Sequence, residues 1–187
     1  IKPGWQAKLT KDESIFLEKT HSRNIKHRNF VDDKPDPMLL EVFNNIFMSI
    51  AEQMGVVLEN TAQSVTIKER LDFSCAVFDP LGNLIANAPH MPVHLGSMEA
   101  SVKAIIKRNE NICNEEVYAL NAPYDGGTHL PDITVVKPVF DKSESKLIFF
   151  VASRGHHTDV GGLTPGSMPP DSRDIQDEGV YIENFKI

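Results

Sequence analysis

Two short segments of the chain carry side chains that could bind a divalent cation. The first is the loop 121–132, which contains His129 and Asp132. Its Gly126-Gly127 pair lets the backbone turn sharply, and Pro131 biases the residue before it toward extended geometry. His129 and Asp132 can therefore project toward one point. An imidazole and a carboxylate three residues apart suit a metal, although the spacing alone is a weak pattern.

The second segment directly follows an apolar, strand-like run and contains Arg154, His156, His157 and Asp159. Neighbouring residues on a strand face opposite ways, so only one of His156 and His157 is expected to reach a shared metal. Asp159 would lie on the face of His157, either as an outer partner that fixes the imidazole tautomer or as a ligand. Arg154 shares the face of His156 and could hold an anionic group of a substrate.

These residues define the predicted site. The candidate catalytic residues are His129, Asp132, His156, His157 and Asp159, and the first four are the candidate metal ligands. Mn, Zn, Fe and Mg all remain possible, because ligand type alone cannot choose among them. Such a metal would polarise a carbonyl group or acidify a water molecule. The alternative is that the histidines only satisfy buried backbone groups.

Further candidates for substrate binding, besides Arg154, are His90, His94 and Arg70. His90 and His94 have the spacing of helical zinc sites, but Pro92 lies between them and argues against a helix there. We therefore expect a loop at the mouth of a site. Arg70 and the nearby Asp72 either are solvated surface charges or orient substrate in a cleft.

Helices and hairpins must position these residues. After Asp36 as N-cap, Pro37 is expected to begin a long amphipathic helix. Its apolar positions, at steps of three and four, are Leu39, Phe43, Ile46, Ile50, Met54 and Val57. A second helix is expected to start at Ser97 as N-cap.

Strand-like runs are expected at residues 73–78, 84–86, 117–120, 133–140 and 147–153. Short polar segments join the first two runs and the last two, so each of these pairs is expected to form a hairpin. The mixture of helices and largely antiparallel hairpins predicts an α+β fold, as a partial domain of a larger enzyme.

Composition narrows the class of protein. The 187 residues are 41% hydrophobic, enough for a core, and the net charge of −7 gives no general attraction to nucleic acid or anionic membranes. Cys75 and Cys113 are expected to be reduced thiols, since no C-x-x-C spacing is present. No stretch approaches the ~20 apolar residues of a membrane span, and the N-terminus lacks the pattern of a signal peptide. We expect a soluble cytoplasmic protein without a nucleic-acid or membrane partner.

Four segments together resemble the hydantoinase B and 5-oxoprolinase family. They are residues 64–74, residues 88–98, Gly126-Gly127-Thr128-His129-Leu130-Pro131-Asp132, and Ser153-Arg154-Gly155-His156-His157-Thr158-Asp159 with the three residues that follow. Residues 164–170 look closest to the 5-oxoprolinase and hydantoinase members. Pro3-Gly4-Trp5 resembles the end of the ATP-binding hydantoinase A half. The implied organisation is a tail of that half (1–9), a linker (10–36) and the N-terminal part of a hydantoinase B-like catalytic domain (37–187).

The resemblance implies an ATP-dependent hydrolase of cyclic amides, such as one that opens 5-oxo-L-proline to L-glutamate. A hydantoinase A-like half, in the same chain or as a subunit, would use ATP and Mg to phosphorylate the amide oxygen. The metal site of carboxylase relatives carries over onto His129, Asp132 and one of His156 and His157. We expect the isolated fragment to be inactive and the complete enzyme to be a homo-oligomer. The alternatives are a hydantoinase, an acetone or acetophenone carboxylase-like subunit, and a non-catalytic scaffold for the ATP-using half.

Overall fold

The computed structural model describes residues 4–19 and 36–187, which belong to two separate units. In the first unit, strands β1 (Trp5–Leu9) and β2 (Ile15–Lys19) form an antiparallel hairpin. Strand β2 lies within residues 10–36, the segment expected to be a linker. Residues 20–35 of the expected linker lie outside the described residues, as do residues 1–3.

The second unit, from Pro37 onward, is built from three α-helices, one short 3-10 helix and six strands. They are α1 (Pro37–Thr61), α2 (Val65–Lys68), β3 (Phe73–Phe78), β4 (Leu84–Asn87), α3 (Pro92–Arg108), β5 (Tyr118–Leu120), β6 (Asp132–Phe140), β7 (Leu147–His156), η1 (Ile175–Asp177) and β8 (Phe185–Lys186). The strands make one sheet in the order β4-β3-β7-β6-β5-β8, and all neighbours are antiparallel. The predicted α+β class with antiparallel hairpins is confirmed.

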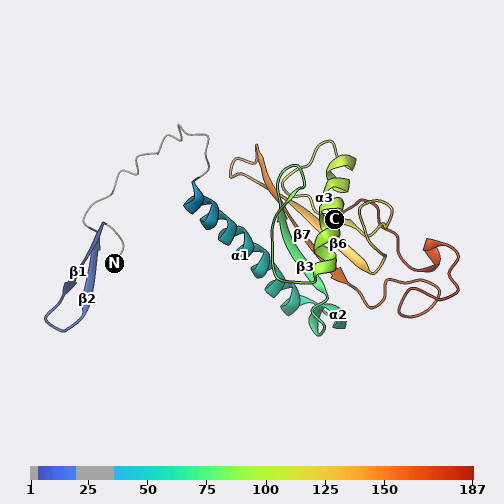
Figure 1. Cartoon of the computed structure of the whole chain (residues 1–187), viewed down its shortest axis with the longest axis horizontal. Helices are drawn as coiled ribbons and strands as arrows, with labels where there is room; N and C mark the ends of the chain where they lie inside the picture. The colour runs from blue at the N-terminus through green and yellow to red at the C-terminus, as the bar shows by residue number, and fades with distance from the viewer. Residues whose placement is uncertain (1–3, 20–35) are drawn as a thin grey trace. The chain divides into compact units, whose positions relative to one another are not determined.

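The sheet has helices on both faces, and alternation along the strands explains why (Figure 1). In β3, Ala76 and Phe78 belong to the core cluster that includes Met98 of α3, whereas Val77 packs with Ala51 of α1. Successive side chains of a strand point to opposite faces, so α1 and α3 cover opposite faces of the sheet. Among the described residues, no helix combines the length and apolar character needed to cross a membrane.

Helix α1 begins at Pro37, as its apolar periodicity predicted, but the expected start of the second helix at Ser97 is wrong. Helix α3 begins at Pro92, after Met91 as N-cap. Proline is well suited to the first position of a helix, because its fixed φ is helical and no backbone N–H is needed there. His94 therefore lies on a helix and not in the expected loop.

Candidate metal site

The register of the β6–β7 hairpin brings the two predicted segments together. Asp132 is the first residue of β6 and His156 the last of β7, and the two are paired across the ladder. Thr134 is likewise paired with Arg154 on the same face, two residues further along each strand. Two neighbouring strand ends thus deliver their polar side chains to one place, as the sequence indicated.

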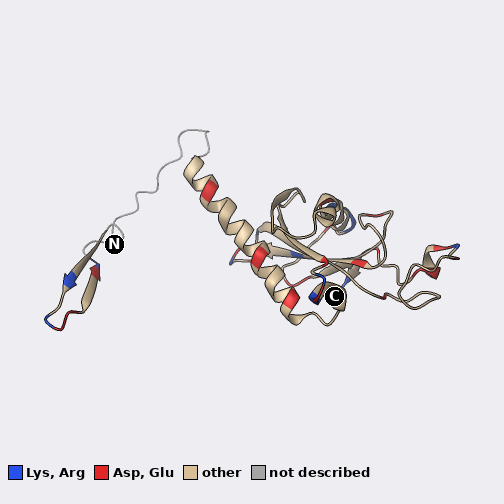
Figure 2. Ribbon diagram, turned by 60° about the horizontal axis from the view of Figure 1, so that its bottom comes forward, with Lys and Arg blue, Asp and Glu red and all other residues tan. Residues whose placement is uncertain are grey.

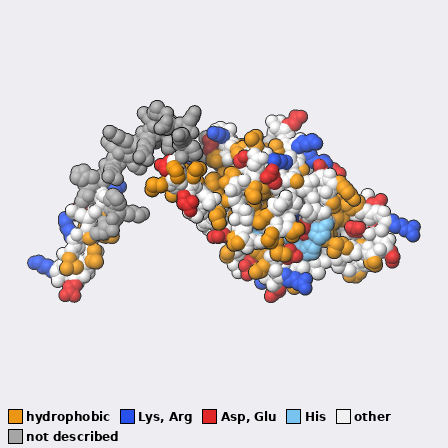
Figure 3. Space-filling model, viewed as in Figure 1, with side chains coloured by type: hydrophobic (Ala, Val, Ile, Leu, Met, Phe, Trp, Pro, Cys, Tyr) orange, Lys and Arg blue, Asp and Glu red, His pale blue; other side chains and the backbone are white. Residues whose placement is uncertain are grey.

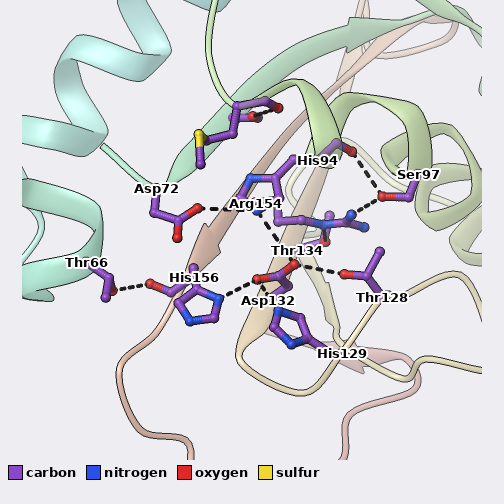
Figure 4. Close-up of polar contacts among 12 residues, drawn as sticks. Thr66, Asp72, His94, Ser97, Thr128, His129, Asp132, Thr134, Arg154 and His156 are labelled. Atoms are coloured by element: carbon purple, nitrogen blue, oxygen red, sulfur yellow. Dashed lines mark hydrogen bonds and ion pairs between the residues drawn. The ribbon is translucent and has the colours of Figure 1, made fainter. Parts of the chain in front are cut away.

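Asp132 lies between two imidazoles (Figure 4). Its Oδ1 is 2.9 Å from Nε2 of His129 and 2.9 Å from Nδ1 of His156. Its Oδ2 accepts a 2.9 Å hydrogen bond from Thr128 Oγ1. One ligand atom from each of His129, Asp132 and His156 lies within 4.8 Å of the other two, and no other such group of three occurs within residues 4–19 and 36–187.

The carboxylate is buried and the imidazoles are partly exposed. The side chain of Asp132 is 6% exposed, those of His129 and His156 41% and 23%. On the face shown in Figure 3, histidine side chains reach the surface in one place. Two imidazoles and one carboxylate fit a catalytic type of metal site, in which three protein ligands leave further positions for water or substrate.

Electrostatics keep Asp132 in the form that a cation requires. Burial opposes ionisation of the carboxyl group, but hydrogen bonds from His129, His156 and Thr128 outweigh burial and hold the pKa of Asp132 well below its usual range. The hydrogen bond to Asp132 in turn raises the pKa of His129. The cluster therefore has an ionised carboxylate at neutral pH.

His94 lies behind this cluster and has no free access to solvent. Its Nε2 is 3.5 Å from Asp72 Oδ1 and 3.6 Å from Asp132 Oδ2, and its side chain is 5% exposed. Burial lowers the pKa of His94, and its Nδ1 has no hydrogen-bond partner among the described residues. The neutral ring then carries its proton on Nε2, between the two carboxylates. The structure thus gives His94 a contact with Asp132 instead of the expected contact with substrate.

Arg154 is buried completely and holds three elements together. Its Nε donates to Thr134 Oγ1 of β6 at 2.7 Å, and its two terminal nitrogens donate to the hydroxyl oxygens of Ser97 and Ser101 on α3. Arg154 lies on the same strand face as His156, as expected, but α3 packs on that face through Ser97 and Ser101. The proposed role of Arg154 as a substrate anchor is therefore at odds with the structure.

His157 and Asp159 do not join the cluster. The backbone N–H of His157 donates to the Pro131 carbonyl, and burial lowers the pKa of its ring. Asp159 accepts from the backbone of Gly161 and Gly166, at 2.8 and 2.9 Å, and so shapes its own loop. None of its hydrogen bonds within the described residues reaches His157. The expectation that one histidine of the pair faces the site is met by His156, whereas the expected Asp159–His157 contact is wrong.

Arg70 and His90, the remaining predicted substrate residues, line one pocket beside α1. Several residues of the site escaped prediction. Their roles depend on contacts between elements, and four of them are common polar residues: Thr128, Ser97, Ser101 and Thr134. Asp72 was expected to be either a solvated surface charge or a group that orients substrate, and its contact with His94 was missed. The one available signal was strand register, since Thr134 lies opposite Arg154 once the hairpin is aligned.

The fold and this cluster together define a class: an α+β domain with a His-Asp-His cluster at the end of an antiparallel hairpin, in an arrangement that could hold one metal ion. The chain belongs to the hydantoinase B/oxoprolinase family, whose model matches residues 36–187. The resemblance noted from the sequence is thereby confirmed.

Particular relatives agree with this assignment. The chain is 51% identical, over an alignment of 189 residues, to 5-oxoprolinase 1 of Arabidopsis thaliana, and spans 14% of that protein's length. The crystal structure of the ATP-dependent caprolactamase from Pseudomonas jessenii matches with a TM-score of 0.72 at 31% identity, covering 82% of this chain and 26% of that one. A nucleotide-free acetone carboxylase structure matches with a TM-score of 0.72 over 81% of this chain and 20% of that one. At 21% identity it shows the fold alone.

Proposed function

We propose that this chain is the metal-binding part of an ATP-dependent enzyme that hydrolyses a cyclic amide, namely 5-oxo-L-proline to L-glutamate. The observation that carries the proposal is the cluster of His129, Asp132 and His156, found in a chain half identical to a 5-oxoprolinase. A hydantoinase A-like half, in the same chain or as a subunit, would supply ATP and Mg. The homo-oligomer and the cytoplasmic location stay predictions.

Each residue of the cluster has a distinct task in this proposal. Asp132 supplies the negative charge, and His129 and His156 supply nitrogen donors on the exposed side, where a small ring can approach. Thr128 fixes the rotation of the carboxylate through its Oδ2. A divalent metal held there would polarise a carbonyl group or lower the pKa of a bound water. Two imidazoles favour Mn, Fe or Zn over Mg, which prefers oxygen ligands.

The likeness to caprolactamase favours one alternative, in which the ring is a different lactam or a hydantoin. The acetone carboxylase likeness concerns the fold alone and gives less support to a carboxylase. A purely scaffolding role leaves unexplained an ionised carboxylate placed between two partly exposed imidazoles.

The test uses the full-length protein with its ATP-binding half. We expect ATP-dependent formation of L-glutamate from 5-oxo-L-proline, and loss of both bound metal and activity in the double variant His129→Ala, His156→Ala. The matched control is His157→Ala, which removes a neighbouring imidazole outside the cluster and should keep its metal. Full metal content and activity in the double variant would refute the site. Turnover of caprolactam or a hydantoin, without turnover of 5-oxo-L-proline, would refute the substrate.

A further inference from the structure

A second site lies beside α1, apart from the cluster around Asp132. A pocket of about 400 Å³ opens between α1, the turn before β3 and the segment between β4 and α3. Its lining includes Glu52, Val56, Glu59, Arg70, Phe73 and His90. This volume falls in the range of small-molecule sites, which combine apolar walls with a few placed polar groups.

His90 presents a fixed hydrogen-bond donor on the wall of this pocket. Its Nδ1 accepts a 3.1 Å hydrogen bond from the backbone N–H of Cys75, so in the neutral ring the proton is on Nε2. The ring packs on Phe73, with ring centroids 4.8 Å apart. The edge of the ring formed by Cε1 and Nε2 lies beside Gly55 of α1, where a Cβ atom would lie only 2.5 Å from either atom. The His90 ring can therefore occupy this position only because Gly55 has no side chain.

The pocket also carries charges of both signs. Arg70 lies on the turn before β3, and Glu52 and Glu59 lie on α1. The two glutamates are seven residues apart and share one face of the helix. In Figure 2 the ribbon of α1 is coloured for acidic residues at several positions and for basic residues at none. None of Arg70, Glu52 and Glu59 forms an ion pair within the described part of the chain. A guanidinium and an imidazole N–H thus share the pocket with two carboxylates.

One tight turn links the pocket with the candidate metal site. Leu71 has a φ of +55°, a left-handed conformation that is unusual for a residue of its size. Arg70 on one side of it lines the pocket, and Asp72 on the other side lies 3.5 Å from His94. A residue spacing of two limits the Cα atoms of Arg70 and Asp72 to about 7 Å. The pocket is therefore a neighbour of the metal cluster.

We propose that this pocket binds the part of a ligand in which one carbon atom carries both a carboxylate and a nitrogen. The carboxylate would accept hydrogen bonds from Arg70 and His90, and the N–H or ammonium group would face Glu52 and Glu59. Both 5-oxo-L-proline and L-glutamate contain this group, so the pocket is a site for substrate or for product. The choice of these two ligands rests on the proposed function.

The test is isothermal titration of the full-length enzyme, without ATP, with 5-oxo-L-proline, L-glutamate and 2-pyrrolidinone, which is the same ring without a carboxylate. Arg70→Gln should weaken binding of the carboxylate ligands at least about ten-fold, equivalent to about 1.4 kcal/mol. Val56→Trp should block the pocket from an exposed position on α1, without disturbing the core. The control Lys68→Gln removes an exposed charge close by in the sequence and should change nothing.

The outcomes separate this inference from the proposed function. Binding of 5-oxo-L-proline alone assigns the pocket to substrate, and binding of L-glutamate alone assigns it to product. Either result supports the inference if Arg70→Gln and Val56→Trp weaken it. No binding of either ligand, unchanged binding in both variants, or equally tight binding of 2-pyrrolidinone overturns it. Arg70-dependent binding of glutamate by an enzyme that does not turn over 5-oxo-L-proline would leave the pocket standing and refute the proposed function.

Discussion

Replacing Asp132 by Asn should weaken metal binding more than about 100-fold. The amide has the size of the carboxylate but lacks its charge, and Oδ1 of Asp132 is the atom that both His129 and His156 contact. Loss of a residue that only hydrogen-bonds a metal ligand generally weakens metal affinity by about 10- to 100-fold, and this range sets the lower bound. Loss of the ligand itself should weaken metal affinity by more than that range, which corresponds to more than about 2.8 kcal/mol of binding free energy.

The matched control is Thr128→Val, which keeps the carboxylate and removes only the hydrogen bond to its Oδ2. We expect this variant to lose about 10- to 100-fold in metal affinity, so it should bind metal more tightly than Asp132→Asn does. Competition titration with a chelating indicator, on the metal-free full-length protein, measures both affinities. An Asp132→Asn protein that binds metal within ten-fold of the parent, or no worse than Thr128→Val, would show that Asp132 is not a ligand.

Two further predictions concern stability and can be measured on this chain by urea unfolding. Gly55→Ala should lower the free energy of unfolding by about 1–3 kcal/mol, because its Cβ would lie 2.5 Å from the His90 ring. Gly96→Ala, in open space on α3, should raise it by about 0.5–1 kcal/mol, and the reverse order would contradict the packing described. The hydrogen bond from Lys186 lowers the pKa of Glu116 to about 2 from an ordinary 4.5, so Glu116 stabilises the fold above pH 4.5 and ceases to do so as the pH falls toward 2. The stability difference between parent and Glu116→Gln should therefore be clear at pH 6 and small at pH 2.5, and an equal difference at both would refute this.

Local patterns predicted most of the elements that build the site. The apolar spacing after Pro37 predicted α1, and alternating runs with short polar connections predicted the hairpins β3–β4 and β6–β7. The meeting of Asp132 and His156 followed from the same patterns, since an antiparallel hairpin places the start of one strand beside the end of the next. The alternation rule also indicated that only one of the two adjacent histidines would face the site.

The errors concern interactions between elements, which local patterns do not describe. Pro92 was interpreted as a helix breaker, although a proline can equally begin a helix, and only the packing of α3 decides between the two. That error moved His94 into a loop. The packing of Ser97 on Arg154 was missed separately, because the sequence does not show which strand face the helix covers. Whether an arginine on a strand face meets solvent or a helix depends on a segment more than fifty residues away.

The β6–β7 hairpin has its turn, here called the tip, at the end opposite to Asp132 and His156. Asp132 and Phe140 are eight steps apart along β6, about 27 Å at the usual rise of a strand. At the tip, Asp141 fixes the turn by accepting from the backbone N–H groups of Ser145 and Lys146, and Ser143 is exposed. A fluorophore or an inserted peptide at Ser143 would therefore report on this domain, or immobilise it, at a distance from the histidines.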